Sequence, residues 1–362
     1  MIYLDHAATS PIKAAYNQGE CSYWMNPHSG YAINSRNEIA QCETIVRQAL
    51  GLTGGYVIFT FGASHAFQVL ATQRSVTNKK ELVIIAGPWE HESVYDVADY
   101  RYDVEASENM DKHFDPNNPV LYCQQLVNPI TGEYFDINVI RKHKLKSMMQ
   151  MLGVDLTAAI GKCDVQEANV SGCADAIWLS GHKFGTRPGV GVLWISNRLA
   201  KYYRVTIDPT NGHNLVHGTP DVQAIHLLCE RLAFMCTKDY VRRANYNTVL
   251  LQSSMINALK NNGIEFKLFD TVHSSTAIHA LTLPGFNADA LCQFLASKEI
   301  YVSPAKSACA ADNNYRVMQN FGYTNKEAEQ TIRISFSAET TQAYDIIGLV
   351  DAIKEFKLKY VE

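Results

Sequence analysis

Residues 179–191 read Leu-Ser-Gly-His-Lys-Phe-Gly-Thr-Arg-Pro-Gly-Val-Gly. Lys183 lies there in a glycine-rich turn, directly after the apolar, strand-like run 176–180. A lysine at a buried strand end loses hydration, which lowers its pKa and leaves a free amine that acts as a nucleophile. A lysine in an ordinary loop stays solvated, so the surrounding sequence has to decide between a reactive and a structural Lys183.

Strand-like runs alternate with helix-like segments around this turn. Between residues 56 and 194 the apolar runs are 57–61, 82–86, 120–123, 152–155 and 176–180. This alternation is typical of an α/β domain whose mostly parallel sheet is covered by helices on both faces. Ligands of such sheets bind beyond the carboxyl ends of the strands, so chemistry is to be sought there.

After about residue 250 the pattern changes to that of a smaller α+β domain. Its expected elements are helices over 249–259, 289–297 and 344–357 and strands over 277–283 and 331–336. We therefore predict a large α/β domain over residues 15–250 and a small α+β domain formed by residues 1–14 and 251–362.

The composition excludes several classes of protein. The 362 residues are 47% hydrophobic and 19% charged, with a formal net charge of −4. The chain has no basic block of the kind that nucleic-acid binding needs, and the short run 141–146 is typical of a solvated helix face. It also has neither an apolar run of about 18 residues nor a leader pattern, so we expect no membrane insertion or export.

The nine cysteines are scattered and include no Cys-x-x-Cys pair. This spacing argues against a disulfide framework and against a structural zinc site. We expect no metal ligands and a reducing cytoplasm.

Three polar residues follow predicted strands. Ser64 is expected to cap a helix that begins after Gly62, and the free amides of such a helix start favour a phosphate. His91 is either a structural loop residue or a ring that stacks on a planar ligand. Asp155 either caps the following turn or pairs with a cationic ring nitrogen, because a buried carboxylate needs a partner.

The turn Ser180-Gly181-His182-Lys183 resembles the cofactor-lysine turn of the fold-type I pyridoxal-phosphate enzymes, specifically the class V aminotransferase and cysteine desulfurase family. Five further segments resemble that family in the same order along nearly the whole chain. They are 3–11 (Tyr-Leu-Asp-His-Ala-Ala-Thr-Ser-Pro), 26–29 (Asn-Pro-His-Ser), 62–64 (Gly-Ala-Ser), 90–94 (Glu-His-Glu-Ser-Val) and 332–335 (Ile-Arg-Ile-Ser).

The resemblance implies a fold-type I transferase that is a homodimer and binds pyridoxal 5′-phosphate as a Schiff base on Lys183. Asp155 would pair with the pyridinium nitrogen, and His91 would stack on the ring and carry protons. The residues implied to contact the cofactor are Ala63, Ser64, His91, Asn128, Asp155, Ser180, His182, Lys183 and Thr219, the last reaching the phosphate of the other subunit.

For the substrate, the resemblance implies that Arg333 clamps a carboxylate, with Asn128 as a second contact. Residues 307–311, Ser-Ala-Cys-Ala-Ala, resemble the loop that carries the nucleophilic thiol of cysteine desulfurases. Most cysteines are packing residues, but Cys309 is surrounded by polar side chains, as in an exposed loop. The implied reaction converts L-cysteine to L-alanine and leaves a persulfide on Cys309, whose sulfur passes to an unidentified acceptor protein for iron-sulfur cluster assembly or tRNA thiolation.

Two positions depart from the family pattern. Ala158 stands where a glutamine is usual, and Pro129 replaces the second asparagine after Asn128. Both changes remove groups expected near the cofactor's phenolate oxygen. Two alternatives therefore stay open, namely another class V reaction such as transamination or selenocysteine cleavage, and a weakly active scaffold of the same fold.

Overall fold

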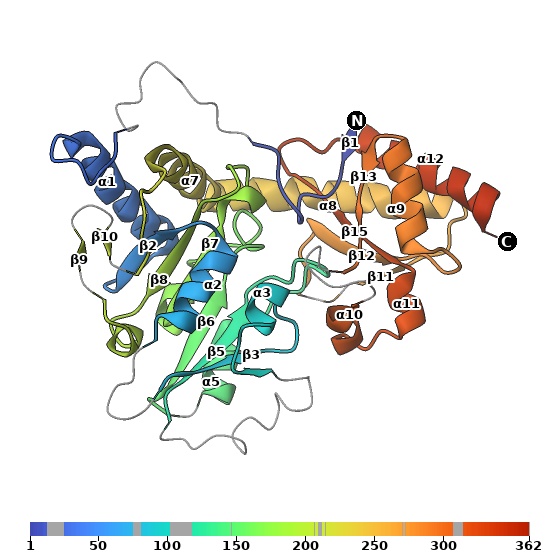
Figure 1. Ribbon diagram of the computed structural model, residues 1–362. Coiled ribbons are helices and arrows are strands. Elements are labelled where there is room, and N and C mark those ends of the chain that lie inside the picture. The colour runs from blue at the N-terminus through green and yellow to red at the C-terminus, as the bar shows by residue number, and fades with distance from the viewer. Residues whose placement is uncertain are drawn as a thin grey trace. The chain divides into compact units, whose positions relative to one another are not determined.

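The computed structural model describes residues 1–12, 25–74, 81–101, 118–145, 147–205, 207–208, 212–213, 215–269, 271, 273–306 and 314–361. The chain divides into two compact units, which are described separately (Figure 1). The larger unit holds residues 11–126 and 136–240, and the smaller holds residues 1–10, 127–135 and 241–362. The domain limits inferred from the sequence stay a prediction.

The larger unit contains a seven-stranded sheet in the order β2-β8-β7-β6-β5-β3-β4. The strands are β2 (Tyr56–Thr60), β3 (Val83–Ala86), β4 (Tyr100–Arg101), β5 (Val120–Gln125), β6 (Gln150–Asp155), β7 (Ala176–Ser180) and β8 (Gly191–Ile195). Only β8 among them runs antiparallel to its neighbours, β2 and β7. The predicted α/β class with a mostly parallel sheet is confirmed.

Every residue of β5, β6, β7 and β8 is buried, so both faces of the sheet centre are covered. The helices of this unit are α1 (Ile33–Leu50), α2 (Ala63–Thr72), α3 (Glu92–Tyr95), α5 (Ile137–Lys144), α6 (Val170–Cys173) and α7 (Val222–Met235), with short 3-10 turns η3 (Gly181–Lys183) and η4 (Leu199–Tyr202). A two-stranded ribbon joins β9 (Ile207–Asp208) to β10 (Gly212–His213).

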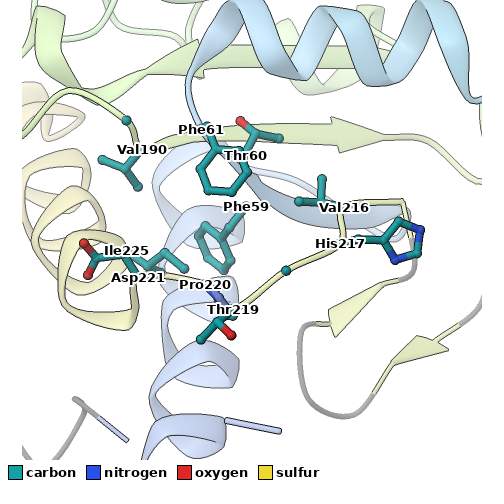
Figure 2. A pocket seen from close by; sticks show the side chains of 12 residues that line it. Phe59, Thr60, Phe61, Val190, Val216, His217, Thr219, Pro220, Asp221 and Ile225 are labelled. Carbon is teal, nitrogen blue, oxygen red and sulfur yellow. The ribbon is translucent and has the colours of Figure 1, made fainter. Parts of the chain in front are cut away.

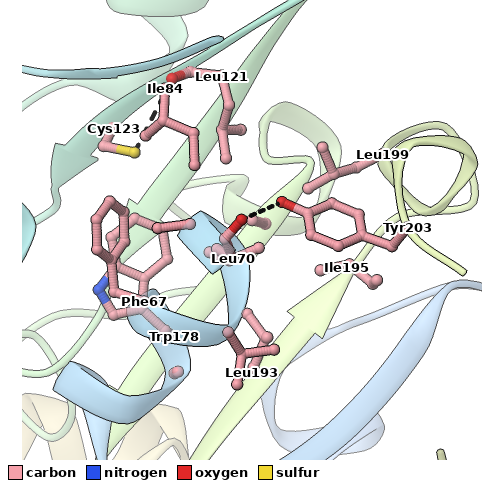
Figure 3. Close-up of a cluster of buried hydrophobic side chains, with 14 of the residues drawn as sticks. Phe67, Leu70, Ile84, Leu121, Cys123, Trp178, Leu193, Ile195, Leu199 and Tyr203 are labelled. Atoms are coloured by element: carbon pink, nitrogen blue, oxygen red, sulfur yellow. Dashed lines mark hydrogen bonds between the residues drawn. The ribbon is translucent and has the colours of Figure 1, made fainter. Parts of the chain in front are cut away.

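The core on one face of the sheet lies under α2, as Figure 3 shows. Phe67 of α2 packs on Trp178 of β7 with ring centroids 5.5 Å apart. The Tyr203 hydroxyl donates a hydrogen bond of 2.8 Å to the Leu70 carbonyl, so this polar tip is satisfied inside the core. These contacts hold α2 against this face of the sheet.

The smaller unit is built on a four-stranded antiparallel sheet in the order β11-β12-β15-β14. Its strands are β11 (Lys267–Leu268), β12 (Ile278–Thr282), β14 (Ser303–Pro304) and β15 (Thr331–Ser335), and β1 (Ile2–Tyr3) pairs in parallel with β13 (Ile300–Tyr301). Its helices are α8 (Lys238–Asn261), whose first three residues belong to the larger unit, α9 (Ala288–Ser297), α10 (Arg316–Asn320), α11 (Asn325–Glu329) and α12 (Ala343–Tyr360). The predicted α+β character of the second half is confirmed.

Among the described residues, none of the helices is both long and apolar enough to cross a membrane.

Candidate functional site

The phosphate-binding candidate lies where β2 passes into α2. Gly62 has a φ of 123°, and a Cβ added there would lie 3.3 Å from Ser180 Oγ. A Cβ on Gly191 would lie 2.7 Å from the Cα of Gly62, so the ends of β2, β7 and β8 meet closely at two glycines. The close approach brings Ser180 to the start of α2.

The expectation that Ser64 caps α2 is wrong, because Gly62 is the N-cap residue. Ser64 is the second residue of the helix, and its side chain is exposed. The N-cap glycine makes no side-chain capping bond at this helix start. The first amides of a helix have no partner within it, and with the helix dipole they favour an anion. The backbone at Ala63 and Ser64 is therefore suited to a phosphate.

Lys183 ends the 3-10 turn η3, directly after β7. Gly181 opens this turn, and a Cβ on it would lie 2.0 Å from Thr186 Oγ1, so only glycine fits there without movement. The side chains of His182 and Lys183 are half-buried. Burial, together with the charge of Lys183, lowers the pKa of His182 to about 4, so the ring is neutral at physiological pH.

Asp155 is the last residue of β6, the strand that neighbours β7. Its Oδ1 accepts a hydrogen bond of 2.7 Å from the Thr157 amide, so it does hold the following turn. Burial raises the pKa of the carboxyl group, although the charge of Lys183 acts in the opposite direction. Among the described residues, no lysine or arginine nitrogen forms an ion pair with Asp155. Because a buried carboxylate is costly without a positively charged partner, a bound cationic group would stabilise it.

His91 is the N-cap residue of α3, which follows β3. Its Nδ1 accepts a hydrogen bond of 3.1 Å from the Ser93 amide and lies 2.9 Å from Ser93 Oγ. The neutral ring therefore carries its proton on Nε2. The adjacent Glu90 is buried and accepts a hydrogen bond of 2.6 Å from the Gln125 amide of β5, which fixes this loop to the sheet.

Thr219 lies beside the end of β2 in a pocket of about 350 Å³ that includes open solvent. Phe59 and Phe61 of the same chain line this pocket as well, and Figure 2 shows the side chain of Thr219 on the side of Phe59. Thr219 is exposed, and the Nε2 of His28 lies 3.5 Å from the carbonyl of the preceding Gly218. The quoted segment 26–29 is thus brought next to the residue that precedes Thr219. A contact of Thr219 with a second subunit stays a prediction.

The smaller unit holds Arg333 on β15, with its side chain buried. Arg333 Nη2 donates a hydrogen bond of 2.7 Å to Asp5 Oδ1, and Nη1 donates one of 3.4 Å to the Pro129 carbonyl. Its Nε is buried without a hydrogen-bond partner in the described part of the chain. Ser303 Oγ donates to the other Asp5 oxygen at 2.6 Å. Arg333 is thus held in place with part of its planar donor set unused.

Asn128 is buried, and its Oδ1 accepts hydrogen bonds from the amides of Ile130, at 2.9 Å, and Thr131, at 3.0 Å. The turn continues to Gly132, which has a φ of 80° and where a Cβ would lie 2.5 Å from the Ile278 carbonyl oxygen. Asn128 therefore has a structural function in this turn, and its contacts with cofactor and substrate stay predictions. Cys309 lies outside the described residues.

Sequence reasoning missed Glu90 and Asp5. Asp5 lies in the segment 3–11 that carried the resemblance, but nothing in the spacing of the sequence indicates that it pairs with Arg333, 328 positions away. Glu90 gives a weak signal, since it is an acidic residue directly beside the quoted His91.

Comparison with known proteins gives a consistent result. The family model described as Aminotransferase class-V matches residues 2–346. The putative cysteine desulfurase NifS of Halalkalibacterium halodurans is 22% identical over 372 residues, covering 94% of each chain. Among solved structures, a NifS-like protein matches with a TM-score of 0.79 and 20% identity, covering 98% of both chains. SspA in complex with cysteine matches with a TM-score of 0.68 and 21% identity over 93% of this chain and 99% of its own.

Proposed function

The chain belongs to the aminotransferase class-V family, and on this premise we propose that it is a cysteine desulfurase that uses pyridoxal 5′-phosphate. The reaction converts L-cysteine to L-alanine and keeps the sulfur as a persulfide on Cys309. The relative named a putative cysteine desulfurase and the structural neighbour solved with cysteine support this choice within the family.

One observation carries the cofactor assignment, namely the buried carboxylate of Asp155 at the end of β6, the strand beside β7, which leads into the turn that ends at Lys183. Class V enzymes depend on pyridoxal phosphate, whose ring nitrogen is cationic when protonated. A protonated ring nitrogen is the partner that Asp155 lacks among the described residues. The uncapped start of α2 suits the phosphate in the same way.

The residues of this site therefore fit the cofactor. Lys183 would hold it covalently, and Ala63, Ser64, Ser180 and His182 would bind its phosphate. In a homodimer, Thr219 of the partner subunit would complete the phosphate site. When bound, the cofactor supplies an electron sink for the substrate carbon.

The other steps belong to side chains of this chain. Arg333 binds the substrate carboxylate through its planar donor set, of which Nε has no partner in the described part of the chain. The amine of Lys183 takes the Cα proton of the substrate. His91 donates or accepts a proton at Nε2, because its Nδ1 is engaged by the Ser93 amide.

Cys309 acts last as the nucleophile. Its thiolate attacks the sulfur of the substrate, a sulfur–sulfur bond forms and the carbon–sulfur bond breaks. The electron pair of the broken bond stays on carbon, which takes a proton to become the methyl group of alanine. One cysteine and one thiol thus give one alanine and one persulfide, with atoms and electrons balanced.

The persulfide is passed to an acceptor protein of iron-sulfur cluster assembly or tRNA thiolation, which we leave unidentified. We place the protein in the cytoplasm, because the seven described cysteines are all free thiols, a state that a reducing compartment preserves.

The test is an absorbance spectrum of the purified protein before and after L-cysteine, with alanine and sulfide measured under reductant. Lys183→Ala should abolish the cofactor band, whereas the control Lys201→Ala, at an exposed lysine, should keep it. Cys309→Ala should abolish sulfide formation, whereas Cys292→Ala should not.

A cofactor band without cysteine turnover would refute the desulfurase and leave another class V reaction, for which selenocysteine and amino-group acceptors are the next substrates. Absence of the band would refute the cofactor assignment and favour the scaffold.

A further inference from the structure

Helices α1 and α7 of the larger unit bring together side chains that the proposed reaction does not use. Glu38 and Cys42 lie four residues apart on α1, and His226 and Cys229 lie three apart on α7. Both spacings place two side chains on the same face of a helix. The four side chains thus form one cluster at the contact of the two helices, which we call the α1–α7 cluster.

The distances within the α1–α7 cluster are close to those of a metal site. Glu38 Oε1 lies 3.4 Å from Cys42 Sγ and 2.6 Å from His226 Nδ1. All three ligand atoms lie within 4.8 Å of one another. Neighbouring ligand atoms of a tetrahedral zinc site are about 3.3–3.8 Å apart, given bond lengths of about 2.0–2.3 Å. The distance between Glu38 and His226 is shorter than this and has to lengthen on metal binding.

The burial of the side chains in the α1–α7 cluster and their chemical types also favour a bound cation. Glu38 is 5% exposed, and Cys42 and Cys229 are completely buried. Cys229 Sγ donates a hydrogen bond of 3.6 Å to the Cys42 carbonyl oxygen, so a second buried thiol lies against the backbone of Cys42. Carboxylate, imidazole and thiolate groups together suit zinc, whereas magnesium and calcium prefer oxygen ligands alone.

The contact of the second ring nitrogen of His226 is a second, independent indication of a metal site. His226 Nε2 lies 3.3 Å from Glu230 Oε1, one turn further along α7. A histidine that binds a metal through one nitrogen typically donates the N–H of the other to a carboxylate, which fixes the ring and its tautomer. The side chains of His226 and Glu230 are 30% and 59% exposed, so a cation can enter from this side.

We propose that the α1–α7 cluster binds Zn²⁺ through Glu38, Cys42 and His226, with Cys229 as the fourth ligand and Glu230 as a positioning residue. Binding releases the thiol protons to solvent. None of the residues proposed for the cofactor lies on α1 or α7, so the ion has a structural function and joins the two helices. Sequence spacing indicated no metal, because the ligands come as two pairs separated by more than 180 positions.

The test uses the full-length protein with its cofactor. It is stripped of metal with a chelator and titrated with Co²⁺, whose tetrahedral thiolate complexes absorb in the visible range beyond the cofactor band. We expect about one cobalt per chain and displacement of the cobalt by zinc. Absence of the tetrahedral bands in the wild-type protein would overturn the proposal without any variant.

Variants then locate the site. Cys42→Ser and His226→Gln should abolish the tetrahedral bands, and Glu230→Gln should weaken affinity by about 10–100-fold with the bands retained. The matched control is Cys236→Ser, at a buried thiol that ends α7 outside the cluster. Bands that persist in both cluster variants, or that vanish in the control, would place cobalt elsewhere and overturn the proposal. Circular dichroism verifies that each variant is folded.

Discussion

His279 makes the stability of the protein depend on pH in a way that a single substitution isolates. It lies on β12 and is 1% exposed, and its Nε2 donates a hydrogen bond of 2.9 Å to the Thr276 carbonyl. Its ring also packs on Phe336, with centroids 5.0 Å apart. Burial lowers the pKa of His279 to about 4, although the bond to Thr276 acts against this change.

The direction in which stability changes with pH follows from the pKa values of His279 in the unfolded and the folded chain. An unfolded histidine has a pKa of about 6.5, so between that pH and about 4 the unfolded chain takes up a proton that the folded chain excludes. The stability contributed by the neutral ring is complete above pH 6.5 and is lost as the pH falls. One pH unit in this window costs about 1.4 kcal/mol, so the free energy of unfolding falls by about 2 kcal/mol between pH 6.5 and pH 5.

The assay is urea unfolding at pH 7.5 and pH 5 for the wild-type protein and His279→Gln, whose amide can still donate to Thr276. Other groups titrate in both proteins, so the difference between their pH dependences belongs to His279. We expect His279→Gln to lose about 2 kcal/mol less than the wild type on going to pH 5. The same change at the exposed His273 is the control. Equal pH dependences of the wild type and His279→Gln would refute this account of the buried ring.

Three further substitutions test packing and charge around the two units. Asp5→Ala leaves the buried Arg333 without its carboxylate and should cost about 3–5 kcal/mol in urea unfolding; a loss below 1 kcal/mol would mean that the pair is effectively solvated. Gly132→Ala places a Cβ 2.5 Å from the Ile278 carbonyl oxygen at a positive φ and should cost at least about 1–3 kcal/mol, which an unchanged melting temperature would contradict. Phe67→Ala removes a ring from the core under α2 and should cost about 3–5 kcal/mol, whereas a wild-type unfolding midpoint would show that neighbouring side chains fill the space.

The alternation of apolar runs was sufficient to predict the main strands of the larger sheet, because these strands are buried on both faces and have strong patterns. β8 was not among the predicted strands. Its antiparallel pairing with β2 and β7 could not be predicted either, since an apolar run carries no information on the direction of a strand. In the smaller unit, β12 and β15 were predicted from their runs, and their register depends on cross-strand packing that the sequence does not display.

The candidate site residues were predicted from motifs, and the structure explains why local rules alone did not suffice. Ser64 obeys the composition rule for a helix cap, but the chain turns at Gly62, whose positive φ starts the helix earlier. The pair of Asp5 with Arg333 and the α1–α7 cluster depend on contacts between segments far apart in the chain. Residue propensities and short sequence spacings contain no information on such contacts, so these contacts become visible only in the folded structure.

The meeting of Gly62 and Gly191 has a consequence for how this sequence can change. A Cβ on Gly191 would lie 2.7 Å from the Cα of Gly62, so a side chain there has to displace the backbone opposite. That clash cannot be relieved by a smaller neighbour, since Gly62 is already glycine. Gly62 itself has a φ of 123°, a backbone conformation that favours glycine. In a library of random variants, both positions should therefore remain glycine even if selection acts on folding alone.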